Sequence, residues 1–378
     1  MPLRATLSSY WQTIQGDLFP CLQEALGPLS EKHKQVITVI EVARIEAFVG
    51  VWRGLPGRPL KDRRALSRAF AAKAVLGLPQ TNMLIERLCV DKSLRRLCGF
   101  EHVSEVPSAA TFSRAFAEFA VSALPARVHE ALIKRTHAER LVGHIARDAT
   151  AIEAREKPMK VAAPATPKRQ RGRPRKGEAV AKKEPRRLQR QGTMSLAEML
   201  ADLPKHCAVG TKRNAKGHTS SWIGYKLHLD VADGDIPVTG LLSSASLHDS
   251  QAAIPLATIT ASRVTNCYDL MDTAYDAPEI REKSRALGHV PIIAAHPRSI
   301  DGGKAEIAAE AKCQRHAGYQ LAEDVRYHER SAAERVNARL KDEFGGRHVR
   351  VRGHAKVYCH LMFGVLALAV DQLMRLVM

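Results

Sequence analysis

The sequence predicts an α/β fold, a mixed sheet with flanking helices, preceded by a small all-helical domain. Three observations support this prediction. Residues 10–135 carry apolar side chains at three- and four-residue spacing with few β-branched alternations, which is typical of helices. Beyond residue 136, short β-compatible segments alternate with helical ones, as they do around a sheet. A long segment inside this second part has too few large apolar side chains to fold alone.

The size and charge of the chain favour a nucleic-acid-binding protein. Its 378 residues, of which 45% are hydrophobic, can bury one large core or two ordinary ones. The formal net charge of +19 produces a positive field that attracts polyanions. Nucleic acid is therefore the leading partner, and an acidic membrane surface is the weaker one.

The sequence shows no membrane-spanning, export or zinc-binding signal, so we expect a cytoplasmic protein without a membrane partner. The longest apolar run, residues 361–370, is too short to span a bilayer and is expected to be a buried core helix. Residues 1–15 do not have the charged, apolar and small-residue order of a signal peptide. The seven scattered cysteines contain no C-x-x-C pair, which predicts reduced thiols and no zinc site.

The N-terminal helical domain, residues 1–135, is predicted to bind DNA. Helices are expected at 62–76, 81–89 and 91–99. Ser108 is expected to cap a further helix that carries Arg114 near its start. This helix fits the second helix of a helix-turn-helix, whose first residues face the major groove. A plain helical bundle with solubilising arginines explains the pattern equally well.

Residues 155–192 are predicted to form a basic, flexible insertion. Its central residues match the core of an AT-hook: Arg171, Gly172, Arg173 and Pro174. In that motif an extended segment lies in the narrow minor groove of A·T-rich DNA, where the potential is most negative. The alternative is a generic basic linker, which would bind phosphates without sequence preference.

Residues 136–154 and 193–378 are predicted to form one sheet domain. The first strand, within 136–154, holds Asp148 near its middle. Residues 222–244 form a hairpin, because apolar residues alternate strictly in the first arm. Strands at 264–272 and 290–295 follow, with helices around them. The order of strand, hairpin, strand, helix and strand is that of a ribonuclease-H-like domain.

Two further features lie between the insertion and the hairpin. Ser195 and Glu198 form a capping box at the start of a helix. A basic loop at 212–217 follows, and three of its side chains are expected to contact DNA: Lys212, Arg213 and Lys216.

One helix, residues 327–341, carries a stripe of charged and aromatic side chains. Four residues fall within roughly 60° of one another at the helical period: Tyr327, Arg330, Glu334 and Lys341. A carboxylate flanked by two cations suits a site that holds a metal and phosphates together. An exposed helix with spaced ion pairs is the alternative. Arg335 and Asn337 are judged to lie off the stripe and receive no catalytic role.

The spacing Tyr-x2-Arg-x3-Glu-x6-Lys resembles the motif around the glutamate of DDE transposases from bacterial insertion sequences. The resemblance implies a ribonuclease-H-like catalytic domain in which two aspartates from neighbouring strands and a glutamate from a helix hold two Mg²⁺ (or Mn²⁺) ions. The matching residues are Asp148, Asp272 and Glu334. In the same way, Arg330 and Lys341 are implied to hold phosphate oxygens.

Other side chains compete for roles in this site. Tyr327 is expected to stack on the DNA end or simply to pack. Asp230 lies within a strand, and Asp249 and Asp276 are expected to be helix caps, as aspartates before helices usually are. Asp249 is the strongest rival ligand, because a His-Asp pair before a helix can also approach a metal.

The resemblance implies a DNA transposase that acts on element ends and target DNA as a homodimer on DNA, in the cytoplasm with the bacterial nucleoid. Water and then the freed 3′-OH attack phosphodiesters in a Mg²⁺-dependent reaction. One alternative is a DNA-binding or regulatory protein derived from a transposase that no longer cuts. A second is a structure-specific nuclease on the same fold, which would not join strands to a target.

Overall fold

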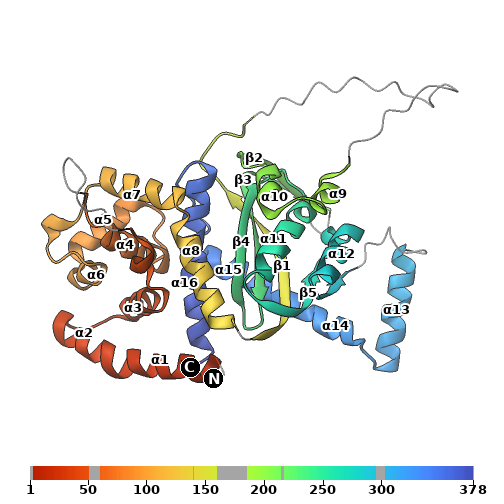
Figure 1. Ribbon diagram of the computed structural model, residues 1–378, viewed down its shortest axis with the longest axis horizontal. Helices are drawn as coiled ribbons and strands as arrows, with labels where there is room; N and C mark the ends of the chain where they lie inside the picture. Colours follow the sequence, from red (N-terminus) through yellow and green to blue (C-terminus); the bar gives the residue numbers. More distant parts are fainter. Residues whose placement is uncertain are drawn as a thin grey trace.

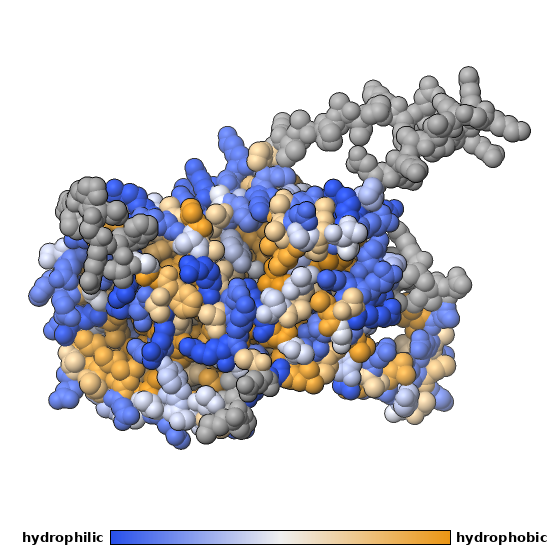
Figure 2. Space-filling model, in the orientation of Figure 1, coloured by the Kyte–Doolittle hydropathy of each residue, from blue (hydrophilic) through white to orange (hydrophobic). Residues whose placement is uncertain are grey.

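The computed structural model contains a helical part and a sheet part, with helix α16 (His354–Arg375) between them (Figure 1). The structure describes residues 3–50, 60–138, 140–159, 185–213, 217–294 and 303–377. The AT-hook core, Arg171 to Pro174, lies outside the described residues, and so does Lys216. On the face seen in Figure 2, hydrophilic side chains are interspersed with smaller apolar patches.

The helical part holds the helices that the periodicity predicts. It contains α1 (Leu3–Thr13), π-helix η1 (Ile14–Leu18), α2 (Phe19–Leu26), α3 (Glu31–Ala43), α4 (Arg63–Val75), α5 (Thr81–Val90), α6 (Lys92–Cys98), α7 (Ala109–Val121) and α8 (Leu124–His137). Asp62 and Asp91 cap α4 and α6 by accepting backbone hydrogen bonds. Ser108 occupies the N-cap position of α7, but its side chain makes no capping hydrogen bond, contrary to expectation. The hydroxyl of Ser108 lies 3.3 Å from that of Thr111 instead.

The sheet part is built on a six-stranded mixed sheet. Its strands are β1 (Leu141–Glu153), β2 (Ala208–Arg213), β3 (Thr219–Ala232), β4 (Ile236–Ser244), β5 (Thr265–Met271) and β6 (Val290–Ile293). The order is β2-β3-β1-β5-β6, and β4 also pairs with β3. The hairpin β3–β4 and the β1–β3 pair are antiparallel, whereas β1–β5 and β5–β6 are parallel. Apart from β2, the strands follow one another along the chain in the predicted order.

Strand β2 was not predicted. Lys212 and Arg213, expected in a basic loop, belong to β2, where they pair with Ser220 and Thr219. The strand is short, and its cationic residues hide the apolar alternation on which a strand prediction depends. Ile223, one of the alternating apolar residues of the first hairpin arm, is 43% exposed.

Short helices flank the sheet. They are α9 (Arg187–Gln191), α10 (Leu196–Asp202), α11 (Ala253–Ala261) and α12 (Pro278–Ala286). The predicted capping box of Ser195 and Glu198 begins α10. The predicted insertion ends at 192, but α9 is folded onto this layer: Arg187 Nε donates to Asp202 at 2.6 Å, and Gln191 is fully buried.

Helix α16 packs against both parts of the molecule. It contacts α3, α4, α7 and α8 on one side and β4 on the other. Phe363 of α16 lies against Phe70 and Phe116 of the helical part. By length and composition alone α16 is able to cross a membrane, but most of it is buried inside the molecule, and core helices meet the same criterion.

Candidate active site

Asp148 and Asp272 come from adjacent parallel strands. Ala146 of β1 lies opposite Leu270 of β5. Continuing this register by two residues sets Asp148 level with Asp272, which directly follows β5. Both aspartates point to the same face, because side chains alternate along strands with a period of two. The Asp272 carboxylate also accepts a hydrogen bond from the Ala274 N–H at 2.9 Å.

The neighbouring residue Arg147 points to the opposite face of β1. Its guanidinium is 1% exposed and donates two hydrogen bonds, each of 2.8 Å, to the Asp230 carboxylate. These residues are direct cross-strand partners between β1 and β3. The Thr260 hydroxyl also donates to Asp230. Asp230 is therefore an internal ion-pair partner, in agreement with its exclusion from the site.

Burial and a nearby like charge make the Asp148 carboxyl a weaker acid than usual. Burial raises the pKa of Asp148 to about 6, and the charge of Asp272 adds to this increase. The Ala149 N–H and the cations Lys212 and Arg330 lower the pKa in part. The Asp272 carboxylate thus lies close enough for its charge to act on Asp148.

The charged stripe lies beside these aspartates, but not on one regular helix. It runs through α14 (Ala322–Tyr327), the 3-10 turn η6 (His328–Arg330) and α15 (Ser331–Asp342), and α13 (Gly303–Ala317) precedes it. Residues 327–341 are therefore not a single α-helix as predicted. Helix α15 packs against β1, and η6 contacts both β1 and β5.

Arg330 joins the aspartates to the glutamate of the stripe. Its Nη2 donates to Glu334 Oε1 at 2.7 Å, and its guanidinium lies 5.6 Å from the centre of the Tyr327 ring. The Glu334 side chain is 57% exposed. The charge of Arg330 also lowers the pKa of Asp148, so this guanidinium lies near Asp148 as well as Glu334.

Two regions of the sequence match families of transposases. Residues 143–370 match the model described as Transposase DDE domain. This match covers more than half of the chain.

The chain belongs to the DDE transposase family.

Residues 23–118 match a second model, Transposase domain (DUF772). Neither a curated protein nor a solved structure matches the chain. The first matched region begins within β1 and ends within α16, so it includes Asp148, Asp272 and Glu334.

Several cationic side chains of this transposase lie near Asp148. Burial lowers the pKa of Lys341, and the charges of Arg347 and Lys212 lower it further. The charges of Glu153 and Asp148 raise the pKa of Lys341 and so oppose part of this decrease. Lys212, predicted to contact DNA, and Lys341 therefore lie in one cationic cluster beside the aspartate. Tyr327 is half-buried, and burial raises its pKa.

Several other predicted residues lie elsewhere in the transposase. Arg114 is exposed on α7 of the helical part. Asp249 does not cap a helix; it forms an ion pair with Lys226 at 2.8 Å. Asp276 is not the N-cap of α12 either, because Ala277 holds that position. Its carboxylate pairs with Arg281 at 2.9 Å.

A side chain that sequence reasoning dismissed contacts the first aspartate. Asn337 Nδ2 donates to Asp148 Oδ2 at 3.2 Å. The signal was available in the spacing, because Asn337 follows Glu334 by three residues and precedes Lys341 by four, which puts all three on one helix face. Arg335 does lie apart, paired with Asp235 at 2.6 Å.

The carboxylates do not form a closed cage. Among the residues that the structure describes, no three His, Cys, Asp or Glu side chains are grouped so as to hold a metal ion. The reason is visible at Glu334, whose carboxylate is bound to Arg330. Asp148 and Asp272 supply hard oxygen atoms of the kind that Mg²⁺ prefers.

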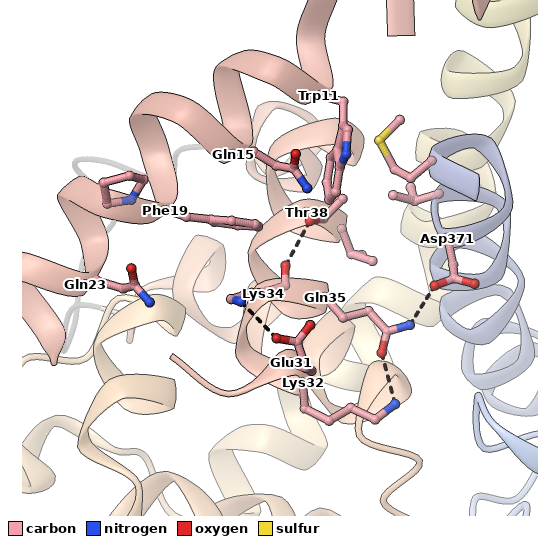
Figure 3. Close-up of a pocket in the computed structure, with 14 residues that line it drawn as sticks. Trp11, Gln15, Phe19, Gln23, Glu31, Lys32, Lys34, Gln35, Thr38 and Asp371 are labelled. Atoms are coloured by element: carbon pink, nitrogen blue, oxygen red, sulfur yellow. Dashed lines mark hydrogen bonds and ion pairs between the residues drawn. The ribbon is translucent and has the colours of Figure 1, made fainter. Parts of the chain in front are cut away.

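A cavity of about 670 Å³ lies between the α1–α2 arm, α3 and the end of α16 (Figure 3). Trp11 and Phe19 line it. Its charged groups are largely neutralised: Lys34 Nζ lies 2.8 Å from a Glu31 oxygen, and Asp371 forms an ion pair with Arg339 at 2.6 Å. A cavity with paired charges suits neither a metal nor a phosphate, so the carboxylate cluster is the better candidate active site.

Proposed function

We propose that this chain is a DNA transposase that cleaves and joins DNA strands with Asp148, Asp272 and Glu334 as its catalytic carboxylates. The observation that carries the proposal is the convergence of Asp148 and Asp272 on adjacent parallel strands, with a raised pKa at Asp148. Two neighbouring carboxylates repel each other unless a cation compensates their charge. The repulsion between these carboxylates destabilises the protein without a cation, and a bound cation would relieve it.

The donor set fits Mg²⁺ or Mn²⁺, the cofactors expected for this family. When bound, such ions would supply positive charge that stabilises the reacting phosphate. Asp148 and Asp272 would hold an ion from the strands. Glu334 would add its oxygens from α15 after release from Arg330.

The cations around the carboxylates are suited to hold the DNA backbone. Arg330 presents a planar donor group able to bind two phosphate oxygens, and Lys341 and Lys212 add charge next to Asp148. Lys212 is exposed on β2. Tyr327, beside Arg330, would stack on the DNA end or support the guanidinium.

DNA contacts outside the catalytic carboxylates complete the proposal. Arg114 on α7, Arg213 and Lys216, and the Arg171–Pro174 core are assigned to element-end and target DNA, with two protomers on the DNA. The net charge of +19 supports a polyanionic partner. The reaction belongs to the bacterial cytoplasm, at the nucleoid.

The proposal is tested with a supercoiled plasmid that carries the DNA flanking the coding region. Purified wild-type protein should nick and join strands only with Mg²⁺ or Mn²⁺. Asp148→Asn, Asp272→Asn and Glu334→Gln should each reduce cleavage by roughly 1,000-fold or more while DNA binding persists. Full cleavage by any of these variants would remove that residue from the site. Cleavage without joining would favour a nuclease, and metal-dependent binding without cleavage a regulatory protein.

A further inference from the structure

We propose that Asn337 belongs to the carboxylate site: it positions Asp148 through its amide N–H and presents its carbonyl oxygen to the divalent ion or to water bound to that ion. The inference rests on the proposed function and adds a residue to it. Asn337 lies on α15, one turn after Glu334 and one turn before Lys341.

The first observation is the contact with Asp148. Asn337 is 6% exposed, and its Nδ2 donates to Asp148 Oδ2 at 3.2 Å. Hydrogen bonds of this kind orient the atoms that ligate a metal. The bond also fixes one oxygen of Asp148, and it links α15 directly to β1.

The second observation is the unpaired end of the same amide. Asn337 Oδ1 is buried and has no hydrogen-bond partner among the residues that the structure describes. A buried amide oxygen without a partner costs roughly 1–3 kcal/mol, so such groups are rare unless a water or an ion satisfies them. An amide oxygen is a hard ligand of the kind that divalent cations accept.

The comparison with Glu334 strengthens the assignment. Glu334 is exposed and bound to Arg330, whereas Asn337 on the same helix is buried against Asp148. The α15 side chain that donates a hydrogen bond to Asp148 is Asn337 and not Glu334. It is therefore a positioning residue whose effect should appear in metal binding and not only in activity.

The test compares Mn²⁺ binding to the full-length protein without DNA, followed by the electron paramagnetic resonance signal of free Mn²⁺. Asn337→Ala removes both amide atoms, and Asn337→Asp retains an oxygen at the same place. Arg335→Ala is the matched control, because it removes an exposed ion pair from the same helix. Asp148→Asn reports on the metal site itself. Thermal unfolding in EDTA confirms that each variant is folded.

Asn337→Ala should weaken Mn²⁺ binding by roughly 10- to 100-fold, the usual effect of losing a group that orients a metal ligand. Asn337→Asp keeps the oxygen but loses the N–H donor, so it should bind Mn²⁺ more tightly than Asn337→Ala does. Arg335→Ala should bind it unchanged. Wild-type affinity in a folded Asn337→Ala protein would overturn the proposal and leave Asn337 as a packing residue. If Asn337→Ala does not fold, wild-type affinity in a folded Asn337→Leu protein, which also lacks both amide atoms, would overturn it instead. Unchanged binding by Asp148→Asn would contradict the proposed function rather than the role of Asn337.

Discussion

At the scale of single residues, the ionised carboxylate of Asp148 destabilises the folded protein. Burial and the charge of Asp272 raise its pKa from 3.8 to about 6. The folded state therefore holds the proton more tightly than the unfolded chain does. The free energy of unfolding should fall as the pH rises between these two values, and it should stay lowered above the higher one.

A first prediction follows for Asp148→Asn. A neutral amide does not carry this cost, so the variant should be more stable than wild type at pH 8 by about 1–3 kcal/mol, at about 1.4 kcal/mol per pKa unit. The gain should vanish near pH 4, where the wild-type carboxyl is protonated. Urea denaturation in EDTA at both pH values measures this difference. Equal stability at pH 8 would show that Asp148 is not destabilised by its surroundings.

A second prediction concerns the ion pair between Arg330 and Glu334. Arg330→Gln should free the Glu334 carboxylate and so tighten Mn²⁺ binding. It should also reduce strand cleavage by roughly 100-fold or more, because a cation that stabilises the phosphate is lost. Mn²⁺ titration and the plasmid assay measure the two effects, with Arg335→Gln as the control on the same helix. Weaker Mn²⁺ binding by Arg330→Gln would contradict this account of the pair.

The sequence predicted candidate residues for the site but not the contacts that these residues make. Asp148, Asp272 and Glu334 could be chosen because their types and spacing match a family motif. The hydrogen bond from Asn337 and the capture of Glu334 by Arg330 could not be chosen in that way, because they depend on side-chain positions between distant elements. Asp249 was misread as a cap because its ion-pair partner Lys226 lies on strand β3, and Asp276 because α12 begins one residue later than expected.

At the scale of secondary-structure elements, the Arg147–Asp230 pair locks β1 to β3. Arg147 Nη1 also lies 3.4 Å from the Met271 sulfur of β5, directly before Asp272. The pair thus connects, on the opposite face of the sheet, the strands that lead to both aspartates. The sequence predicted strands at the positions of β1, β3, β4, β5 and β6, but not at that of β2.

A third prediction tests this internal pair. Arg147→Ala should destabilise the protein by roughly 3–5 kcal/mol, because it leaves the buried charge of Asp230 without its partner. Replacing both residues, Arg147→Met with Asp230→Leu, should restore most of the loss. Urea denaturation at pH 7 measures both variants. A stable Arg147→Ala protein would show that the pair does not hold the strands.

At the scale of the whole molecule, α16 unites two parts that the sequence separates. The chain order predicts a boundary near residue 135, and α8 does end at His137. Contacts of α16 with both α8 and β4 could not be predicted, because they join residues more than 100 positions apart. The apolar run at 361–370 did indicate that the helix is buried, which the structure confirms.

A fourth prediction concerns the basic insertion and its effect on DNA choice. Arg171→Ala with Arg173→Ala should reduce the preference for A·T-rich over G·C-rich duplexes, because these arginines are proposed to enter the minor groove. Lys182→Ala with Lys183→Ala removes the same charge outside the core and should weaken both duplexes alike. Competition binding at fixed salt distinguishes the two double variants. An identical effect of both would favour a generic basic linker.

The central claim is that Asp148 and Asp272 form one cation site on neighbouring strands. The most direct measurement is the anomalous difference map of a crystal soaked in Mn²⁺. The account predicts a peak that contacts carboxylate oxygens of both aspartates at about 2.1 Å, near the distance usual for Mg²⁺ sites. A soaked crystal with both carboxylates ordered and no peak between them, or with Mn²⁺ held elsewhere, would contradict it.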